Sequence, residues 1–122
     1  MARPYTVLFV DDDDAVRDVV SQALSHAGFF VVTACDGYAA LCVLMEHHVD
    51  LLLTDVVMPG ISGFEFAQQA KLIRPRLKIL YTTGYADRAA GRGDVRYGKV
   101  LPKPVRANAL VSEISEALRG TV

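Results

Sequence analysis

The stretch Leu-Leu-Leu-Thr-Asp, residues 51–55, sets a continuous apolar run directly before a carboxylate. Short apolar runs at 7–10, 79–81 and 100–101 are likewise followed within two residues by polar side chains. Uninterrupted apolar runs of this length are typical of strands buried on both faces of a parallel sheet. The carboxyl ends of such strands open onto one edge of the sheet, where ligands bind. The pattern therefore predicts a single edge at which carboxylates, a hydroxyl and an ammonium converge.

Strand-like and helix-like patterns alternate along the chain. Apolar residues at helical spacing separate the expected strands, which cover residues 5–10, 29–34, 50–54, 77–82 and 100–101. Gly28 is placed to end the first helix, and Ser62 or Gly63 to open the third. Such an alternation implies right-handed crossovers and helices on both faces of the sheet. We predict an α/β fold with a doubly wound, five-stranded parallel sheet and about five helices.

The fourth helix is expected to be short or irregular. Four glycines between Thr83 and Lys103 argue against a long helix, because glycine disfavours helix interiors. One or two helical turns at Ala86–Ala90, followed by a loop, fit these residues better. No linker, repeat or low-complexity segment divides the chain, so residues 1–122 are expected to form a single domain.

Composition and charge exclude several classes of protein. The net charge of −1 favours neither nucleic acid nor an anionic membrane. No apolar stretch approaches the roughly 20 residues that span a bilayer, and the first residues lack the pattern of a secretory signal. We expect a cytoplasmic protein that contacts neither nucleic acid nor membrane. Cys35 and Cys42 are spaced too widely for a Cys-x-x-Cys pair, and we expect both to be buried or half-buried.

Four consecutive aspartates follow the first expected strand. Clustered carboxylates repel one another unless a cation is present, and hard oxygen ligands suit Mg²⁺. For Asp11 and Asp12 we favour this metal site, because other polar residues occupy matching strand ends. For Asp13 and Asp14 we favour the alternative, a solvated turn that caps the first helix, with Asp14 as the capping residue.

Asp55 directly follows the most apolar strand, which suggests a nucleophile rather than a loop aspartate. A carboxylate can form an acyl phosphate when a metal aligns the phosphoryl donor. The charge on the transferring oxygens then needs donors, for which Thr83 offers a hydroxyl, Lys103 an ammonium and Gly84 a backbone amide. Alone, the threonine or the lysine would be unremarkable, so the prediction depends on the set.

Four segments together resemble the receiver domain of bacterial two-component response regulators. They are Val-Leu-Phe-Val-Asp-Asp (7–12), Leu-Leu-Leu-Thr-Asp-Val-Val-Met-Pro-Gly-Ile-Ser-Gly (51–63), Thr-Thr-Gly-Tyr (82–85) and Leu-Pro-Lys-Pro (101–104). The resemblance covers essentially the whole chain, so residues 1–122 would be one receiver domain. It implies a flavodoxin-like fold with strand order 2-1-3-4-5.

The resemblance also implies roles for the acidic residues. Asp55 would be the phosphoacceptor, charged by a histidine kinase or a histidine phosphotransfer protein. Mg²⁺ would be bound by Asp12 and Asp55 directly, by Asp11 mostly through water, and by the backbone carbonyl of Val57. The protein would then be a signalling phosphoacceptor and not a metabolic enzyme, with chemistry limited to its own phosphorylation and dephosphorylation.

The resemblance further implies a switch. Thr83 and Lys103 would contact the phosphoryl oxygens, and the face formed by the fourth helix, fifth strand and fifth helix would change its affinity for a downstream protein target. Whether that face also dimerises is left open. The family's switch aromatic usually lies three residues before the lysine, where this chain has Val100. Either Pro102 or Pro104 permits a cis bond next to the lysine.

Two other functions compete with this one. A haloacid-dehalogenase-like phosphatase would use Asp11 and Asp13 with Thr83 and Lys103, but it leaves the segment 55–60 unexplained. A pseudo-receiver would bind partners without being phosphorylated, which the intact acidic pair argues against. The residues do not decide between a stand-alone receiver and part of a larger protein.

Overall fold

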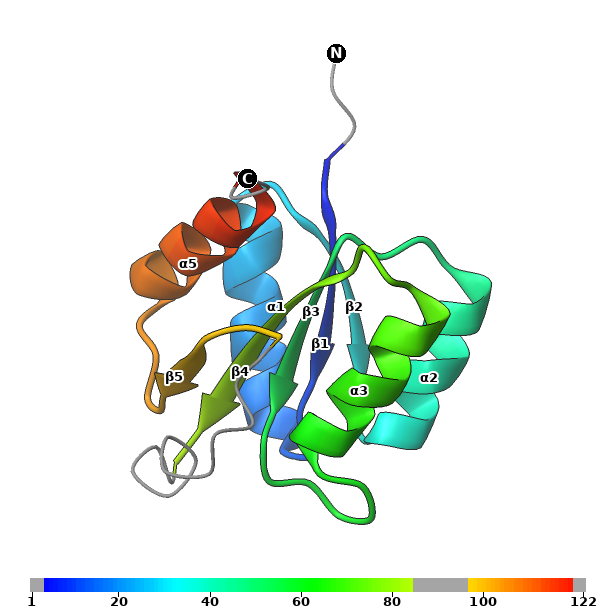
Figure 1. The fold of residues 1–122 in the computed structure, drawn as a ribbon. Helices are drawn as coiled ribbons and strands as arrows, with labels where there is room; N and C mark the ends of the chain where they lie inside the picture. The colour runs from blue at the N-terminus through cyan, green and yellow to red at the C-terminus, as the bar shows by residue number, and fades with distance from the viewer. Residues whose placement is uncertain (1–3, 85–96, 120–122) are drawn as a thin grey trace.

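Five parallel strands form a single sheet (Figure 1). The computed structural model describes residues 4–84 and 97–119. Its strands lie in the order β2-β1-β3-β4-β5 and comprise β1 (Thr6–Val10), β2 (Phe30–Ala34), β3 (Leu51–Asp55), β4 (Lys78–Thr83) and β5 (Val100–Pro102). Every neighbouring pair is parallel. The predicted strand order is confirmed, and each predicted strand matches its observed bounds to within one residue.

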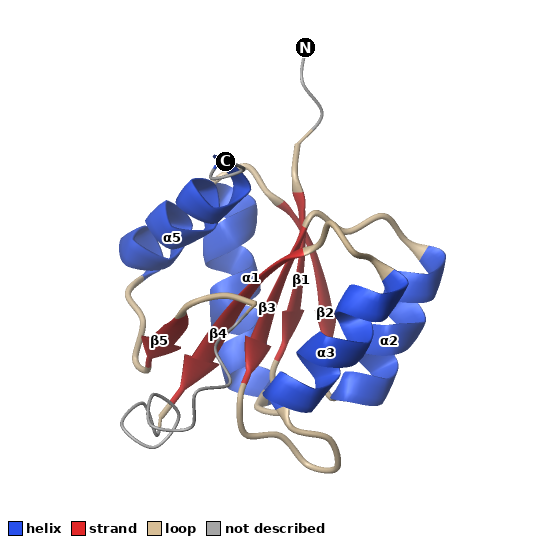
Figure 2. Ribbon diagram, in the orientation of Figure 1, coloured by secondary structure: helices blue, strands red, loops and turns tan. Residues whose placement is uncertain are grey.

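Helices cover both faces of the sheet, as predicted for a doubly wound fold. The described helices are α1 (Asp14–His26), α2 (Gly37–Glu46), α3 (Gly63–Ile73) and α5 (Ala107–Arg119). α1 and α5 lie on one face, and α2 and α3 lie on the other (Figure 2). The short fourth helix expected at 86–90 falls outside the described residues. Within the described ranges, no helix combines the length and apolar character needed to cross a membrane.

The core lies on both sides of β3, whose five residues are all buried. Leu52 packs into the cluster beneath α2 and α3, while Leu51 and Leu53 pack into the cluster beneath α1 and α5. Because successive side chains of a strand point to opposite faces, a strand covered on both sides must be apolar throughout. Each buried leucine contributes about 1.5–3 kcal/mol. This burial anchors the strand that ends at Asp55.

Capping residues set where the helices begin. Asp13 caps α1 with an extended backbone (φ −90°, ψ 116°), and its side chain accepts two amide hydrogen bonds from the first turn. Capping by Asp13 is therefore confirmed, whereas the prediction that Asp14 caps the helix is wrong, because Asp14 is already its first helical residue. Gly28 follows the helix with a φ of 104°, a conformation that glycine adopts without strain. Ser62 caps α3, as predicted, and Asp36 caps α2.

The prediction for the cysteines is wrong, because both thiols are exposed. Cys42 lies midway between Ala40 and Leu44, which form the buried side of α2. Two residues along a helix correspond to a rotation of about 200°, so Cys42 points away from the core. Cys35 lies in the turn that follows β2, an edge strand of the sheet.

Candidate functional site

The predicted site residues meet at the carboxyl ends of the strands. Asp11 follows β1, Asp55 ends β3, Thr83 ends β4, and Lys103 follows β5. Strand register aligns them, since Asp55 lies opposite Thr82 and Thr83 lies opposite Pro102. The sheet thus brings residues from the whole length of the chain to one edge, as the apolar runs predicted.

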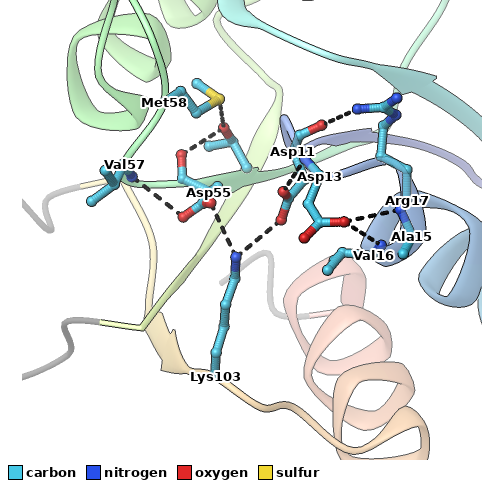
Figure 3. Close-up of polar contacts among 10 residues, drawn as sticks. Asp11, Asp13, Ala15, Val16, Arg17, Asp55, Val57, Met58 and Lys103 are labelled. Atoms are coloured by element: carbon cyan, nitrogen blue, oxygen red, sulfur yellow. Dashed lines mark hydrogen bonds and ion pairs between the residues drawn. The ribbon is translucent and has the colours of Figure 1, made fainter.

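Lys103 joins two buried carboxylates at this edge (Figure 3). Its Nζ atom lies 3.1 Å from Oδ2 of Asp11 and 3.0 Å from Oδ2 of Asp55. Asp11 is 1% exposed and Asp55 is 5% exposed. The Lys103 amide donates to the carbonyl oxygen of Thr83 at 2.8 Å, and the peptide bond between Lys103 and Pro104 is cis. Backbone and side chain of Lys103 are therefore both held at the site.

Burial and the Lys103–carboxylate contacts act in opposite directions on the pKa values of Asp55 and Lys103. Burial raises the pKa of Asp55, and the nearby charge of Asp11 raises it further, while the hydrogen bond and charge of Lys103 lower it. For Lys103, burial lowers the pKa, but hydrogen bonds to Asp55 and Asp11 outweigh it and leave the pKa above its usual value. An isolated ion pair would lower the pKa of its carboxyl, so at Asp55 the ammonium of Lys103 offsets the effect of burial only in part.

The acidic residues form a set of oxygen donors that suits a small divalent cation. Asp11, Asp12 and Asp55 each offer one carboxylate oxygen, and these three atoms lie within 4.8 Å of one another. Two of these residues are buried and Asp12 is exposed, which leaves room for water on one side. Hard oxygen ligands with retained water are the environment that Mg²⁺ prefers. The donor set fits the predicted metal.

Val57 lies beside this set. It is 53% exposed, and its amide donates to Oδ1 of Asp55 at 3.3 Å. That bond uses the Asp55 oxygen that Lys103 does not contact. The role of the Val57 carbonyl as a metal ligand stays a prediction.

The backbone of Asp55 is anchored by residues for which the sequence analysis predicted no role at the site. The hydroxyl of Thr54 donates to the carbonyl oxygen of Asp55 at 3.0 Å and also lies 3.7 Å from the sulfur of Met58. Gly63 donates its amide to the carbonyl oxygen of Val56 at 2.8 Å. A Cβ atom at Gly63 would lie 2.2 Å from the carbonyl oxygen of Asp55. The start of α3 thus packs directly against the end of β3.

Arg17 was also missed by the sequence reasoning. Its guanidinium donates to the carbonyl oxygen of Asp11 at 2.6 Å and pairs with Asp14. The spacing of three residues between Asp14 and Arg17 in a predicted helix was a signal for the pair. The contact to Asp11 had no comparable signal, because it crosses from a helix to a strand end.

The hydrogen bonds of Asp13 argue against the phosphatase hypothesis. Asp13 would have to act as its second catalytic carboxylate, but that carboxylate accepts the amides of Ala15 at 2.9 Å and Val16 at 3.2 Å. Asp11 instead shares Lys103 with Asp55. The arrangement favours a site centred on Asp55.

Comparisons with known proteins agree with this site. The family model described as the response regulator receiver domain matches residues 7–115. Response regulator receiver protein CpdR from Brucella abortus is 40% identical over 114 residues, covering 92% of this chain and 95% of that protein. Sensor kinase CckA from the same organism is 36% identical over 118 residues, covering 93% of this chain but 12% of that protein. The crystal structure of response regulator protein TrrA from Thermotoga maritima, in complex with Mg(2+)-BeF, gives a TM-score of 0.86 at 25% identity and covers 93% of this chain and 98% of that one.

Proposed function

Because this chain belongs to the response regulator receiver domain family of two-component signalling phosphoacceptors, we propose that Asp55 is the residue that accepts the phosphoryl group. The observation that carries the proposal is the position of Asp55, a buried carboxylate at a strand end that is held by Lys103 at 3.0 Å. Asp11 and Asp12 lie beside it, so the acceptor is surrounded by the groups that phosphoryl transfer requires.

The transfer begins with ionised Asp55. One of its carboxylate oxygens attacks the phosphorus of a phosphohistidine, the N–P bond breaks, and the imidazole nitrogen keeps the electron pair. Lys103 then exchanges its contact with the free carboxylate for one with a phosphoryl oxygen. The Thr83 hydroxyl and the Gly84 amide donate to the remaining oxygens. The product is an acyl phosphate on Asp55.

Asp11, Asp12 and Asp55, together with the Val57 carbonyl, would hold Mg²⁺. When bound, Mg²⁺ neutralises negative charge on the carboxylates and on the transferring phosphoryl oxygens. Burial and the charge of Asp11 raise the pKa of Asp55, and a bound cation would offset both effects, which supports this assignment. The complex of the related TrrA with Mg(2+)-BeF supports it independently.

The proposed partners follow from the chemistry. The phosphoryl donor is a histidine kinase or a histidine phosphotransfer protein, and a downstream protein target reads the phosphorylated state. The chain acts as a signalling phosphoacceptor whose reactions are confined to Asp55, rather than as a metabolic enzyme. A cytoplasmic location fits this role.

Labelling with acetyl phosphate and MgCl₂ tests the proposal. Asp55→Asn should abolish labelling on a phosphate-affinity gel, whereas Asp18→Asn, which removes an exposed carboxylate of α1, should label like the wild type. Labelling that survives Asp55→Asn and disappears with Asp11→Asn would instead support a phosphatase. Absence of label in the wild type would support a pseudo-receiver.

A further inference from the structure

Arg17 connects α1 to the acidic end of β1. Its side chain is 18% exposed, and its guanidinium reaches the backbone carbonyl of Asp11 (Figure 3). Nη1 donates to the carbonyl oxygen of Asp11 at 2.6 Å, and Nη2 pairs with Oδ1 of Asp14. A charged donor of this kind forms one of the stronger hydrogen bonds to a backbone carbonyl. The guanidinium thus links two of the four consecutive aspartates.

The Asp11 backbone is held from two sides. Its amide donates to the carbonyl oxygen of Ala34 in β2 at 3.2 Å, and its own carbonyl accepts from Arg17. Because the peptide unit is planar, fixing this carbonyl also fixes the direction in which the chain enters Asp12. Oδ1 of Asp11 additionally accepts the amide of Asp13 at 2.9 Å. The relative placement of the Asp11 and Asp12 carboxylates therefore depends on the contact with Arg17.

The charge of Arg17 acts in the opposite direction. A guanidinium near the acidic residues repels a divalent cation and so weakens its binding. Asp14 offers a compensating negative charge through its ion pair with Arg17, and the carboxylate is 91% exposed, on the solvent side of the pair. The pair can thus supply a rigid donor to Asp11 while limiting the positive charge that the metal site experiences.

We propose that Arg17 is a positioning residue for the divalent cation, with Asp14 as its counter-ion. The proposal rests on the proposed function, because it assumes that Asp11, Asp12 and Asp55 hold Mg²⁺. Partners that orient metal ligands typically change metal affinity by 10–100-fold when they are lost. The positioning effect should therefore exceed the gain in affinity from removing a partly compensated charge.

Titration of the unphosphorylated protein with MgCl₂, followed by the amide NMR signals of residues 11–13, tests this proposal. Arg17→Met removes the charge and both donors and should raise the Kd for Mg²⁺ about 10-fold. Arg17→Lys keeps the charge but lacks the planar fork, so it should raise the Kd by about threefold. Arg76→Met, an exposed position before β4 at the opposite edge of the sheet, removes the same charge and should leave the Kd unchanged.

Two further measurements test whether Arg17 positions the metal ligands and whether Asp14 serves as its counter-ion. At saturating Mg²⁺, Arg17→Met should be labelled by acetyl phosphate within about twofold of the wild-type rate, because the ligands are then fully occupied. Asp14→Asn should weaken Mg²⁺ binding at low ionic strength, and high salt should remove that difference because it screens the exposed charge.

A wild-type or smaller Kd in Arg17→Met would overturn the proposal, because the hydrogen bonds of Arg17 would then make no net contribution to Mg²⁺ affinity. If Arg17→Met does not fold, Arg17→Lys decides, and a wild-type Kd in that variant rejects the proposal. Failure of the wild type to bind Mg²⁺ or to be labelled would instead reject the proposed function. The two failures are therefore distinguishable.

Discussion

At the residue scale, Asp55 combines deep burial with a negative charge that Lys103 compensates only in part. Burial and the charge of Asp11 both raise the pKa of Asp55, and Lys103 lowers it less than these raise it. A cation supplied from solution would relieve this electrostatic cost. The same imbalance that suits Asp55 to its proposed role also makes it a source of instability in the metal-free protein.

Asp55→Asn should therefore stabilise the metal-free protein by roughly 1 kcal/mol at neutral pH, a typical size for a single substitution. The folded protein binds the Asp55 proton more tightly than the unfolded chain does, so the wild type loses stability as pH rises through the raised pKa. The stability gained by Asp55→Asn should vanish below the ordinary pKa of aspartate. It should grow as the pH rises from that value to the raised pKa of folded Asp55, and level off at higher pH.

Circular dichroism melts with EDTA, from pH 4 to 8, measure this difference. About 4 °C in Tm at pH 8 is expected. Asp18→Asn serves as the control for removing an exposed carboxylate and should change the free energy of unfolding by less than about 0.5 kcal/mol. An Asp55→Asn protein that is no more stable than the wild type at pH 8 would contradict the argument.

At the element scale, the junction between β3 and α3 determines where Asp55 lies. Ser62 caps α3 by accepting the amide of Glu65 at 3.2 Å, and Gly63 lets the first turn approach the strand end. The close approach is required because a loop of only seven residues, 56–62, connects the acceptor strand to the helix. The glycine is thus a packing requirement of the site.

Gly63→Ala should destabilise the protein by about 1–3 kcal/mol, the usual cost of overpacking. Its Cβ would meet the Asp55 carbonyl oxygen at 2.2 Å and the Val56 Cα at 2.9 Å, so the acceptor backbone must shift. Urea denaturation and the rate of labelling by acetyl phosphate should both change. Gly84→Ala, where a Cβ meets no atom within 4 Å, is the matched stability control. Equal stabilities for the two variants would show that the junction tolerates the methyl group.

Aromatic packing next to β5 differs from the usual family pattern. Val100 and Tyr97 are partly buried and pack against the cluster beneath α2 and α3, which contains Tyr81. The rings of Phe64 and Tyr81 form an edge-to-face pair with centroids 4.9 Å apart. The aromatic rings of this pair come from α3 and β4.

At the scale of the whole molecule, the site exists only when the chain is folded. Asp11 and Lys103, which contact each other directly, are 92 residues apart in sequence. A cation held jointly by Asp11 and Asp55, whose carboxylates come from different strands, binds the folded state and not the unfolded chain. Metal binding should therefore be linked to global stability.

Mg²⁺ at ten times its Kd should raise the free energy of unfolding by about 1.4 kcal/mol, and EDTA should reverse the effect. Differential scanning calorimetry at increasing MgCl₂ measures the rise in Tm, with NaCl at matched ionic strength as the control for screening. Asp12→Asn should largely abolish the rise because it removes a metal ligand but lies on the exposed side of the site. A rise of equal size in Asp12→Asn would place the stabilising cation elsewhere.

Local patterns in the sequence were enough to predict the fold and the edge of the sheet at which the candidate site lies. Apolar runs such as 51–53 predicted buried parallel strands, because only a strand covered on both faces needs an uninterrupted apolar sequence. Polar residues after those runs predicted a shared edge, since parallel strands end on the same side. Asp36, Ser62 and Gly28 carried local signals for helix ends that depend on neighbouring residues alone.

Contacts between side chains of different strands and helices could be read only from the tertiary structure. It brought Lys103 to 3.1 Å from Asp11 and 3.0 Å from Asp55, and it placed Arg17 against the Asp11 carbonyl. It also exposed Cys42, because the position of the core relative to a nearly all-apolar helix is set by what packs against it. Periodicity specifies which residues share a strand or helix, but the contacts of a side chain across elements depend on packing, which no local pattern encodes.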